Sequence, residues 1–150
     1  MLHLLFSTGQ RRLCLPVALI ARVLPPAQLK PAPQAPDYIQ GLLHYNEQWI
    51  PILDLCQLVY QRPSRNALNT RLVIAHLQQA PSSYLGFIAE SVDETLEMNA
   101  ANFSDSGLHV AEEAFFGDIS THQDDIIYQL KPQQLLSDEA WALLCGNASR

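Results

Sequence analysis

The sequence predicts a mainly β fold with short helices, in a single domain that spans residues 1–150. Apolar residues occur in short runs, several of which alternate with polar residues as the strands of a half-buried sheet do. Turn-forming residues separate these runs, and five of the ten prolines fall within residues 25–37. The chain has 150 residues, of which 48% are hydrophobic, so it can bury a core without disulfides or a metal ion.

The first 37 residues predict a hairpin, a third strand and an extended crossover. Residues 2–7 and 12–17 flank a turn at Gly9 and Gln10, which is the pattern of two antiparallel strands. Residues 20–24 form a further apolar run that ends at Pro25. The proline-rich segment 25–37 cannot form a helix or a central strand, so we expect it to run extended over the surface and to connect two packed units.

A second hairpin is predicted at residues 38–45 and 48–53. Asn46 lies in its turn and tolerates the left-handed backbone that tight turns require. Pro51 has no amide N–H to donate, which places its strand at an edge or a bulge. Asp54 is a favourable N-cap residue, so we expect a short helix over residues 55–60.

The rest of the chain predicts a third hairpin, a last strand and a terminal helix. Residues 72–77 and 84–89 are its two apolar runs, and residues 92–98 continue with alternation. The pattern weakens over residues 99–125. Residues 126–130 form the last predicted strand, which Pro132 ends, and Ser137 begins the predicted C-terminal helix.

The charge distribution makes nucleic acids and anionic membranes poor partners. The net charge is −6, with nine basic residues. Residues 1–71 hold seven basic and three acidic side chains, whereas residues 72–150 hold two basic and twelve acidic ones. This asymmetry fits either a surface that orients a basic partner or solubility alone. The N-terminus lacks the pattern of a signal peptide, and no apolar run reaches about 20 residues, so we expect a cytoplasmic protein without a membrane-inserted segment.

No motif in the sequence predicts catalysis or a cofactor. Cys14, Cys56 and Cys145 have no metal-binding or redox spacing and are expected to be reduced, buried thiols. No phosphate-binding loop or serine nucleophile motif occurs. The densest set of possible metal ligands is His109, Glu112, Glu113, Asp118, His122, Asp124 and Asp125, for which a solvated acidic surface is the simpler interpretation. A β-rich chain of this kind is expected to act through its surfaces, and Trp49 is expected in the core or at an interface.

Two segments of the second hairpin resemble CheW-like proteins. Residues 35–43 read Ala-Pro-Asp-Tyr-Ile-Gln-Gly-Leu-Leu, and residues 50–55 read Ile-Pro-Ile-Leu-Asp-Leu. The resemblance continues in order over residues 4–23, 71–75, 85–92 and 126–136. It implies two intertwined five-stranded SH3-like β-barrels with a hydrophobic core between them, joined by the crossover near residues 25–37, and no catalytic activity.

CheW-like proteins are adaptors that couple chemoreceptor tips to the regulatory domain of a CheA-type histidine kinase. The resemblance therefore implies these two partners, and a cytoplasmic location associated with membrane receptor arrays. Two other interpretations stay open. One is a sensor of a small ligand or second messenger that uses the groove between the barrels, and the other is a metal-dependent enzyme built on the acidic cluster of residues 109–125.

The resemblance also assigns interface residues by matching position. The receptor-facing set is Ile20, Arg22, Gly41, His44, Asn46 and Glu47, and the kinase-facing set is Arg71, Val92 and Thr95. Core packing is an equal interpretation for Ile20 and Val92, as is backbone geometry for Gly41.

Several positions depart from the family pattern. The family turn reads Asn-apolar-Arg-Gly, whereas residues 44–47 read His-Tyr-Asn-Glu. Arg22 stands where an acidic residue is usual, and Glu90 where aspartate is usual. These changes imply a specialised adaptor whose partner carries complementary changes.

Overall fold

The computed structural model describes residues 1–77, 80–104 and 115–136. Over these residues the chain forms strands, one short α-helix and three short 3₁₀ turns. The strands are β1 (Leu2–Thr8), β2 (Arg11–Pro16), β3 (Ile20–Leu24), β4 (Ile39–Tyr45), β5 (Gln48–Asp54), β6 (Arg71–Leu77), β7 (Ala80–Glu97), β8 (Phe116–His122) and β9 (Asp125–Leu130). The helix is α1 (Leu55–Tyr60), and the 3₁₀ turns are η1 (Val17–Leu19), η2 (Ala100–Asn102) and η4 (Pro132–Gln134).

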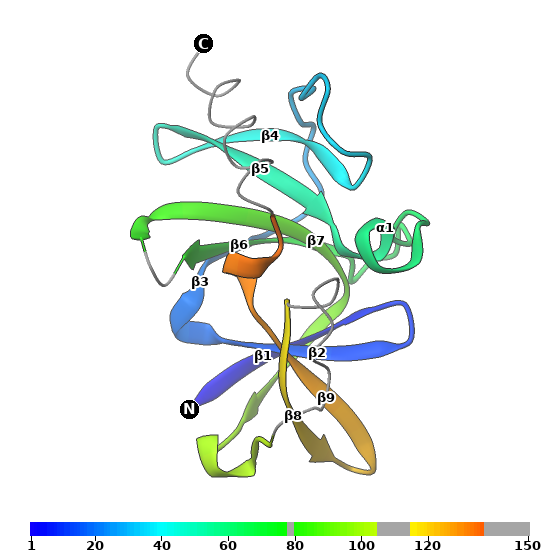
Figure 1. Cartoon of the computed structure of the whole chain (residues 1–150), viewed down its shortest axis with the longest axis vertical. Coiled ribbons are helices and arrows are strands. Elements are labelled where there is room, and N and C mark those ends of the chain that lie inside the picture. Colours follow the sequence, from blue (N-terminus) through cyan, green and yellow to red (C-terminus); the bar gives the residue numbers. More distant parts are fainter. Residues whose placement is uncertain (78–79, 105–114, 137–150) are drawn as a thin grey trace.

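The strands form two barrels that share β7 (Figure 1). In the terminal barrel, drawn below in Figure 1, the order is β8, β9, β2, β1 and the second half of β7. In the central barrel, drawn above, the order is β4, β5, the first half of β7, β6 and β3. An isolated β-bridge closes each barrel. Ser104 pairs with Ile119 of β8 in the terminal barrel, and Lys30 pairs with Leu42 of β4 in the central barrel. The all-β fold with two intertwined five-stranded barrels is thus confirmed.

The long strand β7 explains how the barrels intertwine. The chain begins in the terminal barrel, crosses through η1 into the central barrel, and returns along the 18 residues of β7. Ser91 has a positive φ of 53° at the point where β7 changes partner from β6 to β1, and the register of β1 against β7 shifts between Leu5 and Ser7. The predicted strands at residues 84–89 and 92–98 are therefore parts of one bent strand.

The core lies inside each barrel and between the two barrels. The alternation of β1 sends Leu4 and Phe6 into the shared core, whereas Leu5 packs inside the terminal barrel. On β7, Phe87 faces the same shared core, and its ring lies 5.4 Å from that of Phe6. Ile74 on β6 packs in a separate cluster of the central barrel. Because both faces of these strands are buried, their sequences are nearly continuous apolar runs.

Most predicted elements are confirmed and one strand is new. All three hairpins, the strand at residues 20–24, the helix at residues 55–60 and the last strand lie where the sequence predicts them. Pro51 lies in the part of β5 that pairs with β4, and the recorded pairing of β5 with β7 begins only at Ile52. Strand β8 falls in the region where the pattern weakens and was not predicted. The predicted helix from Ser137 lies outside the described residues.

Among the described residues no helix is long and apolar enough to span a membrane.

Candidate functional site

The turn between β4 and β5 is a tight two-residue turn that projects two polar side chains. Asn46 and Glu47 have positive φ angles of 50° and 63°, as hairpin turns of this length require. Both residues are exposed. The amide Nδ2 of Asn46 donates a hydrogen bond of 3.1 Å to the hydroxyl of Tyr84 on β7. This bond links the turn to the neighbouring strand, so Glu47 is presented on an anchored turn.

Beside this turn, three side chains form an exposed patch on the hairpin. His44 and Trp49 are direct cross-strand partners, and their ring centroids lie 4.9 Å apart. The Lys30 ammonium lies 4.9 Å from the centroid of the Trp49 ring. Trp49 remains 37% exposed. We call Lys30, His44 and Trp49 the hairpin patch.

The hairpin patch borders an open groove of about 410 Å³. Its lining residues come from the end of the crossover and from the hairpin: Gln28, Leu29, Lys30, Leu42, Leu43, His44 and Trp49. Sequence reasoning placed Trp49 in the core or at an interface and did not single out Lys30. The predicted hairpin register already sets Trp49 opposite His44, but the contact with Lys30 depends on how the barrel closes.

Gly41 allows that closure. Its φ is 150°, and a Cβ atom there would lie 2.6 Å from the carbonyl oxygen of Lys30. The next residue, Leu42, exchanges two backbone hydrogen bonds with Lys30, of 2.9 and 2.7 Å. Gly41 is buried beneath this contact. The structure therefore gives Gly41 a backbone role, which lets the chain after β3 approach β4.

The two remaining residues that were predicted to face the receptor lie on β3 and differ in exposure. Arg22 is exposed, whereas Ile20 is half-buried and packs against the shared core. The pairing of β3 with β6 shifts between these two residues. Such an irregularity changes the direction in which a side chain points. Of the pair, Arg22 is the one available to a partner.

The residues predicted to face the kinase lie near the junction of the two barrels. Arg71 begins β6, and its guanidinium donates to the carbonyl oxygens of Leu68 and Thr70. Val92 is buried in the shared core, and its amide donates a 2.9 Å bond to the carbonyl of Asn69. Thr95 is exposed on β7, opposite Leu4. The structure therefore brings Arg71 and Val92 to the same loop, and sets Thr95 further along β7.

That loop covers residues 61–70, and we call it the arginine loop because it carries Arg62 and Arg65. Two buried carboxylates hold it. Asp54, 3% exposed, caps α1 by accepting from the amides of Cys56 and Gln57 and also accepts from the amide and hydroxyl of Ser64. Glu90, 7% exposed, accepts from the amides of Gly9 and Arg65, at 2.9 and 2.6 Å.

The two described cysteines have no nucleophilic character. Burial raises the pKa of Cys14 to about 12. Burial and then the nearby Glu90 carboxylate raise the pKa of Cys56. Both thiols are therefore protonated at neutral pH, as expected for structural cysteines. Cys145 lies outside the described residues.

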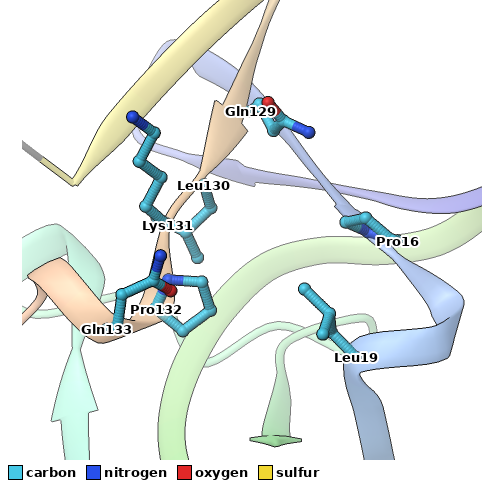
Figure 2. Close-up of a pocket in the computed structure, with 7 residues that line it drawn as sticks. All are labelled: Pro16, Leu19, Gln129, Leu130, Lys131, Pro132 and Gln133. Atoms are coloured by element: carbon cyan, nitrogen blue, oxygen red, sulfur yellow. The ribbon is translucent and has the colours of Figure 1, made fainter. Parts of the chain in front are cut away.

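A small cavity lies where the chain passes between the barrels (Figure 2). Figure 2 shows Pro16 and Leu19 on one side, and residues 129–133, which end β9 and begin η4, on the other. The cavity measures about 170 Å³. Pockets for drug-sized ligands usually measure about 300–1,000 Å³, so this site has room for only a small group.

The acidic cluster of residues 109–125 is only partly described. His109, Glu112 and Glu113 lie outside the described residues. Asp118 belongs to β8, and Asp124 lies in the turn between β8 and β9. In the described part of the chain, no three His, Cys, Asp or Glu side chains are placed to hold a metal ion.

Comparison with known proteins identifies the family. The structure is similar to the crystal structure of the scaffolding protein TtCheW from Thermoanaerobacter tengcongensis, with a TM-score of 0.78 and 18% sequence identity, over 93% of this chain and 89% of that chain. No curated protein sequence matches the chain. A family model described as the CheW-like domain matches residues 2–140. This match covers nearly the whole length, and the chain therefore belongs to the family of CheW-like domains.

Proposed function

We propose that this chain is a non-enzymatic adaptor that couples chemoreceptors to a CheA-type histidine kinase. The observation that carries the proposal is the match of the CheW-like domain model to residues 2–140, together with the double-barrel fold. The protonated thiols of Cys14 and Cys56 offer no nucleophile, which agrees with a role that depends on binding alone.

The receptor would dock on the hairpin face of the central barrel. The hairpin presents His44 and Glu47 as exposed side chains, the hairpin patch adds Trp49 and Lys30, and Arg22 is exposed on β3 of the same barrel. An aromatic ring between a lysine and a histidine suits a partner segment that carries both apolar and acidic side chains. Gly41 contributes to this face indirectly, because it allows Lys30 to approach β4.

The kinase regulatory domain would dock near the junction of the barrels, at Arg71, Val92 and Thr95. Arg71 and Val92 both bond to the backbone of the arginine loop. Val92 is buried, so its part is to fix the loop and the core rather than to offer contact area. Thr95 and the arginine loop would supply the contacts.

We also infer that the protein works in the cytoplasm, at arrays of membrane receptors. Both partners that the family couples present their binding sites on that side of the membrane. The inference predicts that a fluorescent fusion collects at receptor clusters and disperses when the receptors are deleted.

A titration tests the proposal. Calorimetry of the purified chain against the CheA regulatory domain of the same organism, and separately against a receptor cytoplasmic fragment, should show saturable binding in both cases. Trp49→Ala should weaken receptor binding by about tenfold and leave kinase binding unchanged, because it removes an exposed aromatic from the hairpin face only. A chain that binds neither partner at high concentration would contradict the adaptor function.

A further inference from the structure

The arginine loop exposes a leucine that contributes nothing visible to the fold. Leu68 is 94% exposed, whereas the other exposed large apolar side chains of the described chain range from 37% to 67%. A leucine left in water forgoes the stabilisation that burial would provide. A single exposed apolar residue is ordinary on a mobile loop, so the rigidity of this loop decides whether Leu68 is informative.

The first half of the loop is fixed by two buried carboxylates. Asp54 accepts from the amide of Ser64 at 2.9 Å and also from its hydroxyl. Glu90 accepts from the amide of Arg65 at 2.6 Å. Charged acceptors make stronger hydrogen bonds than neutral ones, and both carboxylates are nearly excluded from water. The backbone at residues 64 and 65 is therefore held from within the fold.

The second half is fixed around the leucine itself. The buried hydroxyl of Thr70 donates to the carbonyl of Arg65 at 2.6 Å and accepts from the amide of Ala67 at 3.2 Å. The guanidinium of Arg71 donates to the carbonyl of Leu68. Hydrogen bonds thus hold the chain on both sides of Leu68, which lowers the conformational entropy that a partner would have to remove on binding.

The exposed charges of the loop are all positive. Arg62 and Arg65 lie in the loop, Arg71 follows it directly, and residues 61–71 include no acidic residue. Such a segment attracts a surface rich in carboxylates, and repels a basic one. The exposed Leu68 and the positive charges of the loop together indicate a partner surface that is apolar and bordered by carboxylates.

We propose that the arginine loop is a preformed docking element, whose Leu68 side chain enters an apolar pocket bordered by carboxylates on the kinase regulatory domain. This inference rests on the proposed adaptor function. The kinase is the fitting partner because the loop is bonded directly to Arg71 and Val92. The receptor-facing turn lies at the opposite end of β5, a strand of seven residues that spans about 20 Å.

The test compares two matched substitutions in the full chain by calorimetry against the kinase regulatory domain. Leu68→Asp should weaken binding by about tenfold or more, because it places a charge where an apolar side chain is buried in the complex. Ile126→Asp makes the same chemical change at another exposed aliphatic residue, at the β8–β9 end of the terminal barrel, and should leave binding unchanged. Leu68→Asp should keep the wild-type unfolding midpoint, because this side chain is 94% exposed. Ile126 is 51% exposed on strand β9, so Ile126→Asp should lower the midpoint slightly, and binding is compared at a temperature where both variants are folded.

A second variant tests the charge. Arg62→Gln should weaken kinase binding by a few-fold and reduce its dependence on salt, because one cation of the loop is removed. Receptor binding should be the same for Leu68→Asp and the wild type.

The outcomes separate this inference from the function on which it rests. If the wild type binds the kinase domain and Leu68→Asp binds it equally well, the docking element is overturned and the adaptor function stands. Loss of receptor binding alone in Leu68→Asp would also overturn it. If the wild type itself does not bind the kinase domain, both proposals fail.

Discussion

At the scale of single residues, two buried carboxylates hold together segments that are distant in the sequence. Glu90 lies on β7. Its two carboxylate oxygens accept hydrogen bonds from the amide of Gly9 in the β1–β2 turn and from the amide of Arg65 in the arginine loop. One side chain thus ties together three segments that are distant in the sequence. Asp54 does the same for the start of α1 and for Ser64. Both residues are acidic yet buried, which marks them as structural rather than as solvated surface charges.

Replacing Glu90 by alanine should destabilise the fold by about 2–4 kcal/mol, because the amides of Gly9 and Arg65 lose their acceptor. Urea unfolding measures this change, and hydrogen exchange at the two amides should accelerate. Glu94→Ala is the matched control on the same strand. Its exposed ion pair with Arg12, at 3.6 Å, should contribute about 0.5 kcal/mol or less. Equal losses in the two variants would contradict the structural role of Glu90.

Cys14 predicts a specific pH dependence of stability. Its folded pKa, about 12, lies above the ordinary value of 9.0, so the unfolded chain loses this proton first as the pH rises. The contribution is fully present below pH 9 and falls by about 1.4 kcal/mol for each pH unit between 9 and 12. Urea unfolding at pH 8 and pH 10 measures it. In Cys14→Ala the loss of stability over this interval should be smaller, and an identical loss would refute the assignment.

At the scale of elements, local sequence patterns predict the hairpins, whereas the pairing of distant strands is known only from the structure. The turns at Gly9 and Asn46 lie between short apolar runs, so both of these hairpins could be predicted from the sequence alone. The sequence did not predict strand β8. The register of its pairing with β9 shifts between Phe116 and Ile119, and Ile119 also bridges to Ser104. These long-range contacts leave no regular local pattern. The parallel pairs β2 with β9 and β5 with β7 join distant segments, which no local pattern reveals.

In the candidate site too, some residues could be predicted from the sequence and others only from the structure. The exposed turn residues Asn46 and Glu47 were predicted from the hairpin and the family resemblance, and the structure places them on an anchored turn. Lys30 and Leu68 were not predicted. Lys30 reaches Trp49 only because the crossover folds back onto β4, and Leu68 is informative only because remote carboxylates fix its loop. Both features depend on tertiary contacts.

Closure of the central barrel gives a prediction at this scale. Gly41→Ala should destabilise the fold by about 2 kcal/mol or more, because the new methyl group meets the backbone oxygen of Lys30 at a φ of 150°. Gly117→Ala is the control, since the nearest atom there belongs to the flexible side chain of Lys131. Thermal unfolding should show the larger loss for Gly41. A Gly41 variant as stable as the Gly117 variant would contradict the closure role.

At the scale of the whole molecule, the double barrel holds the hairpin turn and the arginine loop apart on one packed structure. The hairpin turn precedes β5, and Asp54, at the other end of this strand, holds the arginine loop. The shared core and the continuous β7 connect both barrels, so the two surfaces keep a fixed relation. This arrangement suits the proposed adaptor function, because two partners could then bind at once without overlapping.

The charges of Arg22 and Glu47, which are proposed to face the receptor, give the last prediction. Arg22 and Glu47 are both exposed. Arg22 reverses the charge that is usual at its position, and Glu47 adds a charge where the family pattern has glycine. Arg22→Glu and Glu47→Arg should each weaken binding of a cognate receptor fragment by a few-fold, because each disturbs the complementarity of one surface. The double variant restores the net charge of that surface and should recover part of the affinity. Asp118→Lys makes the same change in net charge as Glu47→Arg on an exposed position of β8, and should leave receptor binding unchanged. Calorimetry on the wild type, the two single variants and the double variant completes the cycle. Strictly additive losses would show that Arg22 and Glu47 do not contact the same partner surface.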